Sequence, residues 1–123
     1  MKKTIFIVED NEVYLKLVKA VVNTMPDLEV IIETEGGRAL ELMKKDIPDL
    51  IILDIQLPGI NGIEICKELR KLPEFKNIPI IAMTGYPEDF DEYIASEAGF
   101  NKLFSKPIEL NDFIKSIQDF LSV

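Results

Sequence analysis

The hydrophobic residues of this chain follow two patterns that alternate along its length. Short runs rich in isoleucine and valine have the length and composition of buried strands, and the segments between them repeat apolar residues at helical spacing. The clearest helical stripe begins at Tyr14 and returns every three or four residues as far as Met25. The expected strands cover residues 4–8, 28–33, 50–53, 80–83 and 102–105.

Capping and helix-breaking residues predict a helix after each of these strands. Asn11 is a suitable N-cap for the first helix, and Pro26 helps to end it. The last helix carries the apolar residues between 110 and 121 on one face. The other helices are expected from Gly36-Gly37 to about Lys45, from Asn61 to Pro73, and over about 89–98, before Gly99.

Alternating strands and helices indicate an α/β fold, with right-handed βαβ units and a parallel sheet that is covered on both sides. Five strands favour the order 2-1-3-4-5, which is the flavodoxin-like doubly wound (βα)5 arrangement. We expect a single domain over residues 1–123 and no output domain, because the chain stops just after the fifth helix. In such sheets, functional residues gather outside the carboxyl ends of the strands.

Composition narrows the classes of function. No apolar run approaches the ~20 residues of a membrane span, and no signal peptide precedes the first strand, so we expect a cytoplasmic protein. A net charge of −8 argues against nucleic acid as a partner. The chain has no histidine, which excludes a histidine base, a phosphohistidine and a histidine-containing zinc site. The single cysteine, Cys66, cannot form an internal disulfide and lies at the spacing of core residues.

Three acidic residues directly follow two of the apolar strands. Glu9 and Asp10 end the first strand and Asp54 ends the third, and the strand order brings these strands side by side. Carboxylates ~4 Å apart repel by ~4 kcal/mol at an effective dielectric of ~20, and a divalent cation relieves the repulsion. Oxygen ligands favour Mg²⁺ over zinc. A solvated acidic rim is the plainer alternative, but the position after apolar strands favours a metal site.

Asp54 is the preferred nucleophile, because a carboxylate that attacks a phosphoryl donor forms an acyl phosphate. Lys106 ends the fifth strand before Pro107, and its ammonium suits the charge on the transferring oxygens. Thr84 ends the fourth strand and offers a hydroxyl to a phosphoryl oxygen, and Gly85 beside it keeps the entrance open. These residues indicate a phosphoryl-transfer site.

Four short segments are most informative in combination: Glu9-Asp10, Asp54 with Pro58-Gly59, Thr84-Gly85 and Lys106-Pro107. In order and spacing, over essentially the whole chain, they resemble the marks of a response regulator receiver domain of two-component signalling, and the combination is more specific than any single motif. The resemblance implies that Asp54 accepts a phosphoryl group from a sensor histidine kinase or a histidine phosphotransfer protein. The protein would catalyse at most its own phosphorylation and dephosphorylation, and would switch its contacts with a downstream protein.

The resemblance also implies roles for the other site residues. The three acids and the backbone carbonyl of Gln56 would hold Mg²⁺, and Thr84 and Lys106 would contact the phosphoryl oxygens and report the arrival of the group. Gln56 and Tyr86 each follow a site residue by two positions and should flank the phosphoryl group. There, the amide could orient attacking water and the tyrosine ring could shield the site.

Two positions depart from the usual pattern of the family. Many members carry an aromatic residue three positions before the lysine, where this chain has Leu103; Phe104 is adjacent but should point to the opposite face of the strand. We therefore expect switching to act mainly through the loop after Thr84 and the fourth helix. The first acid is Glu9 instead of the frequent aspartate, and its side chain can reach a metal through water.

Two surfaces are candidates for protein partners. The usual output surface of the family would include Tyr93 and Ile94 on the fourth helix, and the first helix offers Val13 and Leu15 to a kinase or phosphotransfer domain. Simple amphipathic packing explains these residues equally well.

Other classes of protein share this fold. A flavodoxin-type phosphate loop needs hydroxyl- and glycine-rich backbone after the first strand, where the acidic segment 9–12 would repel phosphate. An aspartate-based phosphatase usually places a second acid two residues after a nucleophile on the first strand, whereas Asp54 is on the third and is followed by Gln56 at that position. A receiver-like scaffold that is never phosphorylated is the other alternative, and the presence of all the site residues argues against it.

Overall fold

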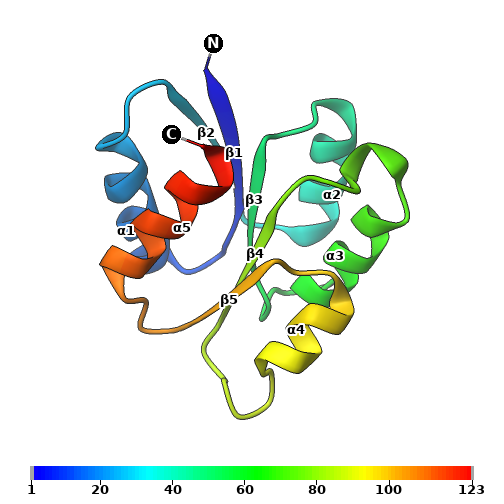
Figure 1. Cartoon of the computed structure of the whole chain (residues 1–123). Helices are drawn as coiled ribbons and strands as arrows, with labels where there is room; N and C mark the ends of the chain where they lie inside the picture. The colour runs from blue at the N-terminus through cyan, green and yellow to red at the C-terminus, as the bar shows by residue number, and fades with distance from the viewer. Residues whose placement is uncertain (1, 123) are drawn as a thin grey trace.

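The computed structural model describes residues 2–122 and contains five strands: β1 (Lys3–Val8), β2 (Leu28–Glu33), β3 (Leu50–Asp54), β4 (Ile80–Thr84) and β5 (Lys102–Ser105). They form one parallel sheet in the order β2-β1-β3-β4-β5 (Figure 1). This order confirms the predicted flavodoxin-like doubly wound α/β fold. β3 is the central strand and β1 lies between it and β2, so the order of the strands reverses between β1 and β3.

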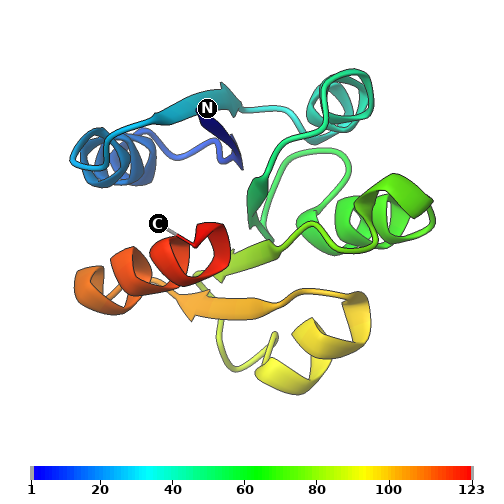
Figure 2. The same ribbon diagram turned by 45° about the horizontal axis from the view of Figure 1, so that its top comes forward.

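Helices connect successive strands: α1 (Glu12–Asn23), α2 (Gly36–Lys45), α3 (Gly62–Arg70), α4 (Glu92–Ala98) and α5 (Leu110–Leu121), with a short 3-10 helix η1 (Pro73–Phe75). α1 and α5 cover one face of the sheet, and α2, α3 and α4 cover the other (Figure 2). None of the helices within residues 2–122 combines the length and apolar character that crossing a membrane requires.

Side-chain caps set the starts of two helices where the sequence predicts them. The Asn11 side chain accepts hydrogen bonds from the backbone amides of Val13 and Tyr14 at the start of α1. The Asn61 side chain accepts one from the amide of Glu64 at the start of α3. Each cap satisfies amides that have no partner inside the helix.

Two predicted helix boundaries are wrong. α4 begins at Glu92 instead of about residue 89, because Asp91 caps it by accepting a hydrogen bond from the amide of Ile94. Pro73 does not close α3, which ends at Arg70; it opens η1 instead. Proline fits the first turn of a helix because the amide hydrogen that it lacks would have no partner there.

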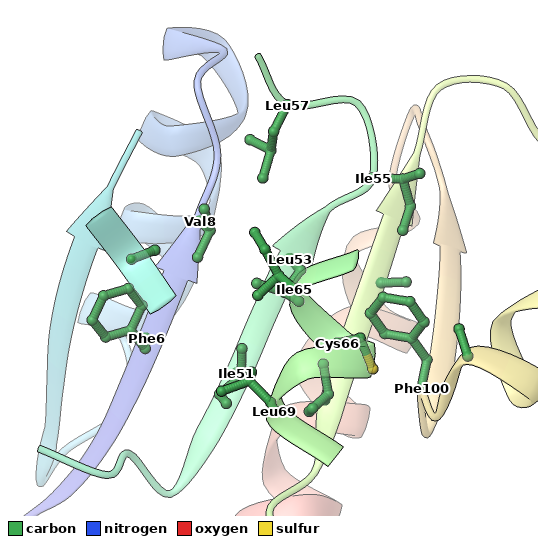
Figure 3. Close-up of a cluster of buried hydrophobic side chains, with 14 of the residues drawn as sticks. Phe6, Val8, Ile51, Leu53, Ile55, Leu57, Ile65, Cys66, Leu69 and Phe100 are labelled. Atoms are coloured by element: carbon green, nitrogen blue, oxygen red, sulfur yellow. The ribbon is translucent and has the colours of Figure 1, made fainter. Parts of the chain in front are cut away.

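The core has two parts, one on each face of the sheet. Alternation along β1 sends Ile5 and Ile7 toward α1 and α5, and Phe6 and Val8 toward the helices of the other face. Figure 3 shows the second part, where side chains of β1 and β3 meet those of α3. β3 is buried along its whole length, so it holds the residue at its end rigidly.

Cys66 lies in this core, as its spacing predicts (Figure 3). Burial raises the pKa of its thiol to about 11, so the thiol stays protonated at neutral pH. A protonated, buried thiol is a poor nucleophile and a poor metal ligand.

Candidate functional site

Three carboxylates meet at the carboxyl ends of β1 and β3. The register pairs Val8 with Leu53, so the residues that follow them emerge side by side. Each of Glu9, Asp10 and Asp54 offers an oxygen, and these oxygens all lie within 4.8 Å of one another. Glu9 and Asp54 are 0% and 3% exposed, and Asp10 is exposed. The three therefore form one acidic cluster that opens to solvent on the side of Asp10.

Lys106 closes this cluster from the end of β5. Its Nζ lies 2.8 Å from Glu9 Oε1 and 3.3 Å from Asp54 Oδ2. Its backbone amide donates to the carbonyl of Thr84 (2.7 Å), and the Lys106–Pro107 peptide bond is cis. Burial lowers the pKa of Lys106, but the hydrogen bonds and charges of Glu9 and Asp54 outweigh that effect and raise the pKa above its ordinary value. The lysine is therefore charged at neutral pH.

Asp54 is held in an environment that disfavours its charge. Burial, together with the neighbouring Glu9, raises the pKa of Asp54 to about 7, although Lys106 acts in the opposite direction. When both are ionised, the buried carboxylates of Glu9 and Asp54 carry two negative charges, and the ammonium of Lys106 neutralises only one of them. A divalent cation in the acidic cluster would balance the remaining charge and favour the ionised, nucleophilic form of Asp54.

A hydrogen-bonded bridge joins the loop after β3 to the loop after β4. The side-chain amide of Gln56 donates to Thr84 Oγ1 (3.1 Å), and its carbonyl oxygen accepts from the amide of Gly85 (3.2 Å). The amide of Tyr86 also donates to Thr84 Oγ1 (3.0 Å). The Thr84 hydroxyl is fully buried and is held by both loops. Sequence reasoning placed Gln56 near the site but missed this bridge, because it joins residues 28 positions apart.

Tyr14 is a second residue that sequence reasoning did not connect with the site. Its position in the apolar stripe of α1 indicated core packing, and its side chain does pack against the core on that face. The face of its ring also lies over Lys106, with Nζ 4.3 Å from the ring centroid. The available signal was its place in the first turn of α1, next to the end of β1.

β5 separates Leu103 from Phe104 as strand alternation predicts. Leu103 packs against the core beside α3 and α4, and Phe104 lies in the core beside α1 and α5. There, Phe104 makes an edge-to-face contact with Phe113, with ring centroids 5.3 Å apart and an interplanar angle of 81°. Its ring is anchored by this contact on the face opposite to Leu103.

Comparison with known proteins agrees with this arrangement. A family model of the response regulator receiver domain matches residues 5–118. The polar-differentiation response regulator DivK of Brucella ovis is 38% identical over 121 residues, which are 98% of each chain. The Mn²⁺-bound form of the response regulator Rcp1 is 32% identical, with a TM-score of 0.81 over 98% of this chain and 92% of that one. The phosphorylated cyanobacterial phytochrome response regulator RcpA is 26% identical, with a TM-score of 0.85 over 98% and 94%. The chain therefore belongs to the response regulator receiver domains, a family of two-component signalling proteins.

Proposed function

We propose that this receiver domain takes a phosphoryl group from the phosphohistidine of a sensor kinase or phosphotransfer protein onto Asp54. The observation that carries the proposal is the cluster of three carboxylate oxygens within 4.8 Å, with Lys106 contacting two of the carboxylates. An Asp54 oxygen forms the new bond to phosphorus while the bond from phosphorus to the histidine nitrogen breaks. The nitrogen leaves with the electron pair and is reprotonated, and Asp54 becomes an acyl phosphate.

The residues of the acidic cluster fit Mg²⁺. Asp10 and Asp54 offer carboxylate oxygens, and the backbone carbonyl of Gln56 would be a further oxygen ligand; this donor set suits a hard cation. Both oxygens of Glu9 are already engaged, by Lys106 and by the amide of Asn11, so Glu9 would hold the ion through a water molecule. When bound, magnesium would neutralise charge on the transferring phosphoryl oxygens. The Mn²⁺-bound form of Rcp1 supports a divalent cation here.

Lys106 and Thr84 receive the phosphoryl group. The ammonium of Lys106 already lies 3.3 Å from Asp54, and it donates to an oxygen of the group once the acyl phosphate forms. The Thr84 hydroxyl exchanges its place in the bridge for a hydrogen bond to another phosphoryl oxygen. That exchange releases the amide of Tyr86 and removes the bond that anchors the Gln56 side chain, which holds the amide of Gly85, and the loop before α4 carries the signal.

The remaining features of the proposed function concern partners, domain and compartment. A single receiver domain accounts for residues 1–123, and it catalyses no reaction beyond its own phosphorylation and dephosphorylation. The acyl phosphate carries about −2 of charge where the ionised carboxylate carried −1, and this change alters the contacts of the protein with a downstream protein. Val13 on α1 and Tyr93 on α4 are 71% and 72% exposed and are available to a phosphodonor protein and a target, respectively. Exchange with a sensor kinase places the protein in the cytoplasm.

A single assay tests the proposal. The protein is incubated with Mg²⁺ and a small phosphodonor such as acetyl phosphate, and intact mass is measured for an acid-stable, base-labile adduct of about 80 Da. We expect the adduct in the wild type, not in Asp54→Asn, and again in the control Asp46→Asn, whose exposed side chain lies beyond the end of α2. Rapid release of phosphate without an accumulating adduct would indicate a phosphatase instead, and neither an adduct nor phosphate release would indicate a scaffold.

A further inference from the structure

We propose that Tyr14 is a positioning residue for Lys106, holding the ammonium over the acidic cluster through a cation–π contact. The Nζ atom lies 4.3 Å from the centroid of the Tyr14 ring, while its other contacts are Glu9 Oε1 at 2.8 Å and Asp54 Oδ2 at 3.3 Å. Lys106 is thus held between two carboxylates and an aromatic face. The inference rests on the proposed phosphoacceptor function.

The ring supplies a restraint that the carboxylates alone lack. A lysine ends in a compact, strongly hydrated charge on a flexible four-carbon stem, so an ammonium at the edge of a site exchanges readily between protein and water. The negative face of an aromatic ring attracts the cation and displaces water from one side of it. Tyr14 therefore restricts the ammonium of Lys106 to positions that face Asp54.

Hydrogen bonds hold the backbone that carries the ring. Glu9 Oε2 accepts from the backbone amide of Asn11 (3.0 Å), and the Asn11 side chain accepts from the amide of Tyr14 (3.3 Å). Since Glu9 Oε1 binds Lys106, the contacts close a circuit from Glu9 through Asn11 and Tyr14 to Lys106 and back. The N-cap of α1 thereby sets the orientation of the lysine at the far side of the site.

The neutral ring also suits the change that phosphorylation demands. Lys106 must move donors from the two carboxylates to a phosphoryl oxygen during the reaction. A third carboxylate at the position of Tyr14 would compete for the ammonium, whereas a ring face attracts the cation without a directional bond. The ammonium can therefore redirect its hydrogen bonds toward the incoming group while it stays over the ring. This lowers the entropic cost of ordering the lysine in the transition state.

Replacing Tyr14 by leucine or phenylalanine tests the inference on the rate of acyl phosphate formation. With Mg²⁺ and acetyl phosphate, we expect Tyr14→Leu to react about two- to tenfold more slowly than the wild type and Tyr14→Phe to react at nearly the wild-type rate. Phe120→Leu is the matched control: it removes an aromatic ring packed against the same core, near the end of α5. We expect it to keep the wild-type rate. An equal loss in the leucine and phenylalanine variants, or none in either, would overturn the inference.

A second measurement does not depend on phosphorylation. The ring current of Tyr14 should shift the NMR signals of the Lys106 ε-methylene protons upfield, and the shift should vanish in Tyr14→Leu and persist in Tyr14→Phe. Ordinary proton shifts in the wild type would overturn the inference on structural grounds. The two proposals fail differently: a wild type that takes up no phosphoryl group refutes the phosphoacceptor function, whereas full activity of Tyr14→Leu refutes only the role of Tyr14.

Discussion

Among the residues of the site, Asp54 is the carboxylate whose ionisation the fold most clearly disfavours. Its ordinary pKa is about 3.9, and in the folded protein burial and Glu9 raise the pKa to about 7. Between these values the folded state binds more protons than the unfolded state, so stability falls as pH rises through this range. Above pH 7 the ionised carboxylate destabilises the fold. A cation bound beside Asp54 would offset this electrostatic cost, and such perturbed carboxylates are typical of functional sites.

Asp54→Asn should therefore stabilise the protein at high pH. Without metal, we expect the free energy of unfolding to rise by about 1–3 kcal/mol at pH 8, because the amide has no charge to bury. At pH 5, about one unit above the unfolded pKa, the gain should be clearly smaller, because the cost grows as the pH rises from about 3.9 to 7. Urea unfolding at both pH values checks this, with Asp46→Asn as the control. A gain that is the same at pH 5 and pH 8 would contradict the assigned cause.

The loop between β4 and α4 is the element most directly connected to Thr84. Gln56 holds Gly85, the first residue of this loop, by accepting a hydrogen bond from its amide. The helix α4 that follows the loop has only 7 residues, about two turns. A short helix that follows a loop held by a few side-chain hydrogen bonds is a natural two-state element. We therefore expect the switch to lie in the loop and in α4.

Removing the Gln56 amide should loosen this loop without phosphorylation. In Gln56→Met, we expect the amide of Gly85 to exchange with solvent about five- to tenfold faster, which corresponds to the loss of about one hydrogen bond. Hydrogen exchange by NMR measures it. The amide of Ile55, which donates to the carbonyl of Met83 inside the sheet, should keep its wild-type rate. Unchanged exchange at Gly85 would show that the bridge does not restrain the loop.

β5 contributes packing at Phe104, away from the loop. The ring contacts Phe113 on the face of α1 and α5, whereas Thr84 follows Met83 of that face and so points to the other one. We expect Phe104→Leu to lower the free energy of unfolding by about 1–2 kcal/mol. The chemical-shift changes that beryllofluoride causes in the loop after Thr84 should stay as in the wild type. Their loss in a folded variant would assign a switching role to Phe104.

At the scale of the whole molecule, Arg70 at the end of α3 joins the segment before β4 to the turn after α4. Its guanidinium donates to the carbonyls of Gly99 (2.9 Å), Phe75 (2.6 Å) and Ile78 (2.8 Å), and to the side chain of Asn101 (2.9 Å). These groups belong to the turn after α4, to η1 and to the approach to β4. One side chain therefore ties the end of α3 to the nearby η1 segment and to the turn after α4, which lies 29 residues further along the chain.

Arg70→Met should be costly for this reason. We expect a loss of about 2–4 kcal/mol in the free energy of unfolding, because partly buried carbonyls lose their donors. Arg38→Met is the matched control: Arg38 is exposed and pairs with Glu33 at 3.0 Å, and such a surface pair contributes less than about 1 kcal/mol. Urea unfolding compares the two variants. Equal losses would mean that the hydrogen bonds of Arg70 do not stabilise the fold.

The sequence by itself determined which segments form strands and helices, and which polar residues follow the strands. A strand such as Leu50–Asp54 can be predicted from its apolar run, because a strand buried on both faces has no polar position before its end. The alternation of strands and helices then determined the sheet order, and the order implied that Glu9 and Asp54 are neighbours. Asn11 and Asn61 marked helix starts because capping is a local interaction.

Tertiary structure decided the contacts between elements. The bridge from Gln56 to Thr84 and the stacking of Tyr14 on Lys106 join side chains from different elements, and the helical stripe of α1 predicts only that Tyr14 is buried. The start of α4 depended on which of several acidic residues became the cap. Periodicity records which face of an element is apolar, but the angle and distance at which two elements meet arise only when the whole chain packs around its core. Those distances determine which side chains touch and what Asp54 can do.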